Sequence, residues 1–146
     1  MLSPLKTEKI FLEKIDVRLA PAFEEKEESA DYKMGVKISV KKRPDVWAFR
    51  IGLALTMTPN DDASCRYERI AVSTVGVFSL PDDAPEDFVK QIVPLNCLAI
   101  LHGFARGIVA QVTGLNDGGA FLLPTVNFHE AIMSKSKKSK TAVRKA

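Results

Sequence analysis

Few residues of this chain have the types and spacing that catalysis or metal binding requires. Its two histidines, His102 and His129, fall in different predicted helices, and its two cysteines, Cys65 and Cys97, lack metal-ligand spacing. The sequence has no phosphate-binding glycine loop and no CxxC, HExxH or GxSxG pattern. We therefore expect no catalytic residues, no metal site and no cofactor. Both cysteines are interpreted as reduced packing residues of a cytoplasmic protein.

The stretch Leu95–Gly114, LNCLAILHGFARGIVAQVTG, has too few polar residues for an ordinary surface helix. At about 100° per residue, only a narrow strip with His102, Arg106 and Thr113 is expected to face water. A second arc of the helix carries small side chains rather than polar ones. The broad arc predicted to pack on a sheet comprises Cys97, Leu98, Leu101, Phe104, Ala105, Ile108, Val109 and Val112.

The small arc consists of Ala99, Gly103, Gly107 and Ala110. A glycine inside a helix costs about 0.5–1 kcal/mol relative to alanine, so two glycines on one face require a reason. Small side chains let another backbone approach closely. We predict a homo-oligomer with Leu95–Thr113 at its centre. The alternative is that the last helix of the same chain covers this arc.

Strands precede this helix in the sequence. Residues 31–41, 46–58 and 66–79 alternate between apolar and polar side chains, and short turn-forming connections join them. This pattern predicts an antiparallel meander. An earlier strand, at 8–20, changes its apolar phase between Leu12 and Ile15, which indicates a β-bulge near Glu13–Lys14. The fold class is α+β, with a short helix starting at the cap residue Asn127.

Length and charge favour one domain, residues 1–133, followed by a basic tail at 134–146 that we expect to be disordered. The sequence contains no unbroken run of about 18 apolar residues, so we expect no membrane span. The net charge is +3, and removing the six tail cations leaves the body at −3. Contact with RNA, an anionic membrane or an acidic partner is the alternative role of the tail, although nucleic acid is not the partner we expect. The tail cations are Lys135, Lys137, Lys138, Lys140, Arg144 and Lys145.

Apolar residues also occur in segments that have no helical or strand period. Loops are normally polar, so such residues either line a groove for other apolar chains or fill the margin of the core. Composition leaves both interpretations open. The residues are Phe23, in the acidic connection 21–30, and Phe121, Leu122, Leu123 and Phe128, after the Gly-rich joint.

Three motifs resemble SecB, the bacterial export chaperone family, in order and spacing. VGVFSL ends a strand, VPLNCLAILHGFARGIVAQVTG contains a step similar to the family's YAR at Phe104–Ala105–Arg106, and AFLLPTVNFHEAI contains a PVNF-like helix start at 124–128. The resemblance spans roughly Lys9 to Ile132 and is strongest after Gly76.

This resemblance implies a four-stranded antiparallel sheet with a long crossover between the first two strands, a long helix packed on one face and a short C-terminal helix. It implies a homotetramer arranged as a dimer of dimers. It also implies an ATP-independent holdase, not an enzyme, that binds unfolded polypeptides or preproteins in a groove containing Phe23, Phe121, Leu122, Leu123 and Phe128. A mobile aromatic groove can accept many sequences.

The sequence departs from the family where SecB presents acidic residues to the translocase motor SecA. Arg18–Leu19 and Ala71 fall near those positions, and the outward strand face carries Lys33, Lys37, Lys41 and Arg50. The resemblance to SecB therefore does not lead us to expect docking to SecA. Two alternatives remain open: a SecB-like chaperone dedicated to one client, such as the antitoxin of a toxin–antitoxin system, and a SecB-fold scaffold without holdase activity.

Overall fold

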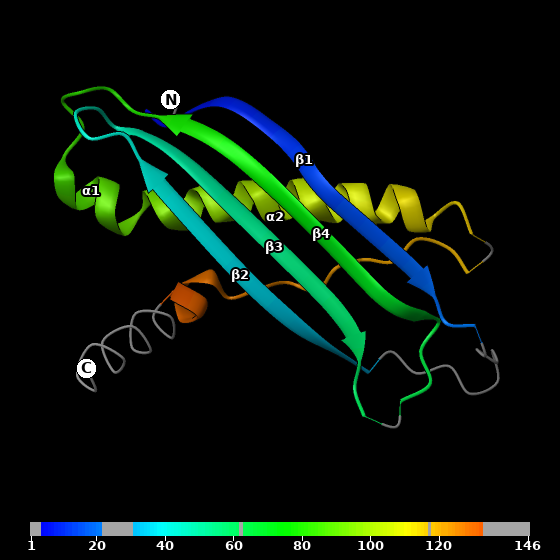
Figure 1. Ribbon diagram of the computed structural model, residues 1–146. Coiled ribbons are helices and arrows are strands. Elements are labelled where there is room, and N and C mark those ends of the chain that lie inside the picture. Colours follow the sequence, from blue (N-terminus) through cyan, green and yellow to red (C-terminus); the bar gives the residue numbers. More distant parts are fainter. Residues whose placement is uncertain (1–3, 22–30, 62, 117, 133–146) are drawn as a thin grey trace.

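A computed structural model describes residues 4–21, 31–61, 63–116 and 118–132, and it consists of one sheet with helices on one of its faces (Figure 1). An extended segment follows the last long helix and ends in a short helical turn at 128–132. The predicted α+β arrangement is confirmed. In chain order the elements are β1 (Lys6–Leu19), β2 (Tyr32–Lys42), β3 (Ala48–Pro59), β4 (Tyr67–Ser79), α1 (Glu86–Gln91) and α2 (Val93–Thr113).

The sheet is antiparallel throughout, with the strand order β1-β4-β3-β2. Short connections join β2 to β3 and β3 to β4, as the predicted meander requires. β1 and β2 lie at opposite edges of the sheet, as the predicted crossover between the first two strands requires (Figure 1). Both of these strands therefore have one edge that no described strand pairs with.

Alternation along the strands gives the sheet two different faces, because residues directly opposite each other in a ladder point to the same side. Ile38, Leu53 and Thr74 are such a set, and their side is called the helix face. Lys37, Ala54 and Ser73 are the neighbouring set, and their side is called the outer face. The buried residues of the helix face that belong to β3 and β4 include Ile51, Leu53, Leu55, Met57, Ile70, Val72 and Phe78.

The predicted β-bulge in β1 is confirmed. Leu12 pairs with Thr74 and Lys14 with Ser73, so Glu13 is an extra residue between two ladder positions. This insertion explains the change of apolar phase. Ile10 pairs opposite Gly76 and Ile15 opposite Val72, which puts both isoleucines on the helix face.

Helix α2 packs on β4, β3 and β1. Most of the predicted sheet-facing arc is buried, but Phe104 and Ile108 are only half-buried and Val112 is 38% exposed. The predicted wet strip was wrong at His102 and Thr113, which are both buried. The helix is turned so that His102 and Thr113 face the extended segment after α2, and this segment excludes water from them. The buried residues of α2 are Val93, Cys97, Leu98, Leu101, His102, Ala105, Val109 and Thr113.

The helical stretch Glu86–Thr113 has the length and the apolar composition of a membrane span. The core of a water-soluble domain also contains helices of this kind. Here the buried side chains of α2, such as Leu98 and Leu101, belong to one hydrophobic cluster with Leu53 and Val72 of the sheet. Burial within the fold therefore accounts for part of the apolar character of this stretch, since 33% of its most apolar window is buried.

Two valines of α2 provide a matched test of this packing. Val109 is fully buried against the sheet, whereas Val112 is 38% exposed. We predict that Val109→Ala lowers the free energy of unfolding by about 2–3 kcal/mol, because it removes buried methyl groups and leaves a cavity. Val112→Ala is expected to cost less than about 1 kcal/mol. Urea unfolding measures both, and equal losses would contradict the orientation of α2.

Candidate functional site

Two hydrogen bonds hold the extended segment 121–128 against α2. The backbone N–H of Phe121 donates to Thr113 Oγ1 over 2.7 Å. The Nε2 of His102 lies 2.9 Å from the carbonyl oxygen of Pro124, and because a carbonyl can only accept, Nε2 is the donor. The segment thus lies along the side of α2 that was predicted to be wet.

Aromatic side chains fix both ends of this segment. The Phe121 ring packs edge-on against Tyr32 of β2 and Tyr67 of β4, with centroid distances of 5.3 and 5.7 Å. The Phe128 ring packs edge-on against His102 at 5.7 Å. The predicted cap is also confirmed, since Asn127 Oδ1 accepts from the N–H of Glu130 at the start of the last helical turn.

The apolar residues predicted to form a groove separate into two groups. Leu123 and Phe128 are buried in the core, and Phe121 is half-buried between the two tyrosines. Leu122 points the other way and is 60% exposed. Among the four predicted groove residues that the structure describes, Leu122 is therefore the one whose side chain is mostly exposed to another chain. The fifth predicted residue, Phe23, lies outside the described residues.

A second exposed apolar surface, which sequence analysis did not predict, lies on β2. Its helix-face residues Met34, Val36, Ile38 and Val40 lie opposite the buried β3 residues Met57, Leu55, Leu53 and Ile51. Helix α2 packs on the other three strands, so this row is only partly covered. Val36 and Val40 are 37% and 53% exposed. The strand alternation placed these residues on an apolar face but could not show that the helix stops short of them.

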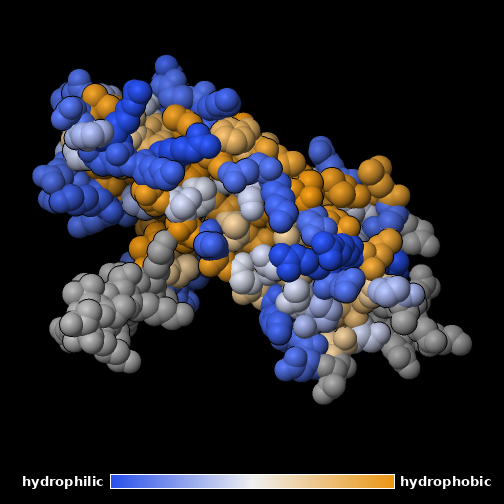
Figure 2. Space-filling model, in the orientation of Figure 1, coloured by the Kyte–Doolittle hydropathy of each residue, from blue (hydrophilic) through white to orange (hydrophobic). Residues whose placement is uncertain are grey.

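Phe121 contacts Tyr32 at the start of β2, which places the next residue, Leu122, near this end of the strand. We call Leu122 together with Val36, Ile38 and Val40 the apolar strip. Figure 2 views the molecule from the opposite, outer face of the sheet, so this strip lies on its far side. On the helix side, Val36, Val40 and Leu122 are 37%, 53% and 60% exposed. Exposed apolar surface bordered by polar residues is typical of a binding site for another apolar chain.

The small residues of α2 lie opposite its buried face. Ala99, Gly103 and Gly107 are exposed and Ala110 is half-buried. A Cβ added at Gly103 or Gly107 would have no described atom within 4 Å. The described part of the last helical turn packs at His102 instead. The described residues of the same chain therefore leave this face open.

Nothing in the described part of the chain brings together the groups needed for catalysis. Burial raises the pKa of the Cys97 thiol to about 12, so the thiol stays protonated and is a poor nucleophile. Cys65 is also buried. His129 is exposed, apart from His102. Among the described residues, no His, Cys, Asp and Glu cluster could hold a metal ion.

The sequence profile described as preprotein translocase subunit SecB matches residues 5–139. This match covers nearly the whole chain. The chain belongs to the SecB family. SecB is a chaperone family rather than an enzyme family, and the apolar surface that this fold exposes agrees with a chaperone role.

Solved structures with the same fold include another member of this class. The chain is similar to a SecB-like chaperone of Mycobacterium tuberculosis, Rv1957, in complex with a ChAD peptide from the Rv1956 HigA1 antitoxin, with 13% identity over 85% of this chain and 91% of that chain and a TM-score of 0.65. At this identity the likeness shows the fold alone. A Streptococcus agalactiae protein of unknown function is 15% identical over 83% of this chain and 97% of that chain, with a TM-score of 0.47. No curated protein matches the sequence.

The histidines of this SecB-family protein test the anchoring of the segment. We predict that His102→Ala, which removes the bond to Pro124 and the ring contact with Phe128, speeds amide deuterium exchange in 121–126. It should also lower the free energy of unfolding by about 1–3 kcal/mol, because the Pro124 carbonyl loses its partner. His129→Ala is the matched control and should change neither quantity. Unchanged exchange in His102→Ala would show that the segment is held by other contacts.

Proposed function

We propose that this SecB-family protein is an ATP-independent holdase of the cytoplasm, which binds unfolded polypeptides, including proteins awaiting export, and delays their folding. The observation that carries this proposal is the apolar strip, where Leu122 and the β2 valines are exposed beside an ordered core. Unfolded chains differ from folded ones in exposing apolar side chains and backbone groups. A surface that offers apolar area without demanding a fixed shape selects for this difference.

The position of the strip suits an extended client. β2 is an edge strand, so its outer backbone groups lie beside the apolar side chains of the same strand. A client segment lying there would bury apolar side chains and could also pair with backbone groups, as in β-strand addition. Each large side chain buried contributes roughly 1.5–3 kcal/mol. Several weak contacts along one client then combine by effective concentration, so no nucleotide is needed.

We also propose that the protein is a homotetramer arranged as a dimer of dimers, with the small face of α2 in a contact between copies. The open space over Gly103 and Gly107 supports this proposal, because a helix of another copy could approach there closely. Ile100, which is 39% exposed beside these glycines, would be buried in such a contact.

A chaperone dedicated to one client is the second candidate. The SecB-like chaperone with the same fold, Rv1957, was solved with a peptide from an antitoxin, and the outer face of this protein lacks the acidic character expected for SecA docking. A panel of unrelated unfolded polypeptides separates the two candidates. A general holdase binds most members of the panel, whereas a dedicated chaperone or a scaffold binds none of them.

Client binding is tested by calorimetry with a chemically unfolded, slow-refolding polypeptide, using its native form as the control. We predict micromolar or tighter binding of the unfolded form alone, without nucleotide. Val40→Ser combined with Leu122→Ser should weaken this binding at least about tenfold, because two apolar contacts are lost. Val46→Ser with Leu115→Ser is the matched control, since Val46 and Leu115 are exposed outside the strip. Equal weakening by both pairs would rule out the strip as the binding surface.

The oligomer contact has its own test. We predict that Gly103→Leu with Gly107→Leu shifts the protein towards smaller species in size-exclusion chromatography with light scattering, because leucine side chains keep a second helix away. Lys33→Leu on the outer face controls for added apolar surface. A native protein that is monomeric over the whole concentration range would refute the tetramer. An unchanged mass in the double variant would place the contact elsewhere.

A further inference from the structure

The outer face of the sheet, on the opposite side from the apolar strip, carries many more basic than acidic side chains. Asp16 is already engaged by Arg18 at 3.1 Å and by Arg69 at 3.9 Å. Among the described residues, neither Lys37 nor Lys41 takes part in an ion pair. The basic residues at outward positions include Lys9, Lys14, Arg18, Lys33, Lys37, Lys41, Arg50 and Arg69.

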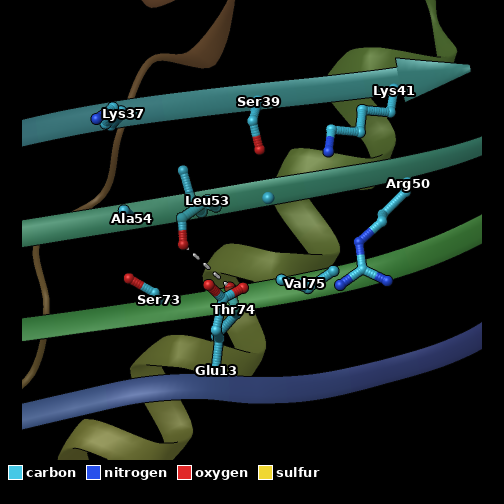
Figure 3. Close-up of a pocket in the computed structure, with 11 residues that line it drawn as sticks. Glu13, Lys37, Ser39, Lys41, Arg50, Leu53, Ala54, Ser73, Thr74 and Val75 are labelled. Carbon is cyan, nitrogen blue, oxygen red and sulfur yellow. Dashed lines mark hydrogen bonds between the residues drawn. The ribbon is translucent and has the colours of Figure 1, made fainter.

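A groove of about 380 Å³ crosses the centre of this face, over β2, β3 and β4. Its floor is made of small residues, Gly52, Ala54 and Ser73. Lys41 and Arg50 are register partners and lie together at one end, with Lys37 towards the other (Figure 3). The bulge residue Glu13 also lines the groove. The groove is therefore a shallow channel with cations at its ends and one carboxylate beside its floor.

Gly52 makes room for the Ser39 side chain at the floor of the channel. A Cβ at this position would lie 2.5 Å from Ser39 Oγ, and the Ser39 side chain leans over the floor from β2 (Figure 3). A glycine in the interior of a strand weakens the strand, and it often marks a site where another backbone approaches closely. The strand thus lacks a side chain at the point where the basic residues surround the floor.

We propose that this groove is a docking site for an acidic segment of a partner protein, bound in extended form over Gly52 with its carboxylates at Lys37, Lys41 and Arg50. Charge complementarity identifies the sign of the partner. A polypeptide fits the whole lining, because its backbone N–H groups can donate to Glu13 and Ser39 while its acidic side chains meet the cations.

A nucleic acid fits the same lining less well. Its phosphates would be repelled by Glu13, and its backbone lacks the regularly spaced N–H donors with which a polypeptide can meet this carboxylate. Stacking of bases needs open aromatic faces. The aromatic side chain next to the groove, Phe11, already lies under two cations, with Lys9 Nζ at 5.2 Å and the Arg50 guanidinium at 5.4 Å from its centroid. The groove therefore favours an acidic peptide over RNA.

Fluorescence anisotropy with a labelled peptide of alternating Glu and Ser tests the proposal on the full-length protein. We expect saturable binding that weakens as salt is raised, and no binding of the same peptide with Gln in place of Glu. Lys41→Glu with Arg50→Glu should weaken binding by roughly tenfold or more. The matched control, Lys9→Glu with Lys33→Glu, makes the same charge change on the same face outside the groove and should have a much smaller effect.

A second variant tests the shape of the groove without changing its charge. Gly52→Ala fills the floor and only requires the Ser39 hydroxyl to turn, so we expect folded protein with weakened peptide binding. Equal weakening by both pairs of charge substitutions would show that the peptide is held by non-specific electrostatic attraction to the basic face. Either that result or full peptide affinity in Gly52→Ala would overturn the proposal. Tighter binding of a labelled single-stranded RNA would overturn it too.

The proposal does not depend on holdase activity. The charge variants should bind the unfolded polypeptide of the calorimetric experiment as the native protein does, because the apolar strip lies on the helix face. If the native protein binds the acidic peptide but not the unfolded polypeptide, the groove is supported as a peptide site and the holdase proposal is rejected.

Discussion

One helix cannot cover a sheet of four strands, and the exposed surfaces of this protein follow from that constraint. Strands lie about 4.8 Å apart, and a helix with its side chains is about 10–12 Å across. Helix α2 packs on β4, β3 and β1, so the apolar face of β2 needs another cover. The extended segment after α2 supplies only part of it, through Phe121 and the buried Leu123. Val36 and Val40 are left at the surface.

The same constraint leaves the sheet with two different exposed surfaces, one for each of the two proposed binding roles. On the helix face, apolar residues of β2 remain available to an unfolded chain. On the outer face, rows of lysine and arginine border a floor of small residues. Since the side chains of a strand alternate, Lys37 and Ile38 serve opposite faces although they are neighbours in sequence. A partner on the outer face therefore need not compete with a client on the helix face.

The strands, the bulge, the long helix and the cap at Asn127 were predictable because each depends on a local pattern. The site was predictable only in part. Apolar composition identified Leu122 and Phe128 equally, yet one is exposed and the other is buried, because their orientation depends on how the segment docks on α2. His102 was misplaced for the same reason. A helical wheel shows which residues share a face, but the cover over that face comes from a segment about twenty residues further along the chain.

The strand order also determines how this protein must fold. β1 is made first, but its partner β4 begins only at Tyr67, after both β2 and β3. During synthesis β1 cannot pair until this distant strand has been made. Such non-local pairing slows folding and leaves unpaired strand edges exposed. Before β4 is made, the nascent chain of this protein therefore exposes the apolar face of β1. That surface is of the same kind that the proposed holdase would recognise in its clients.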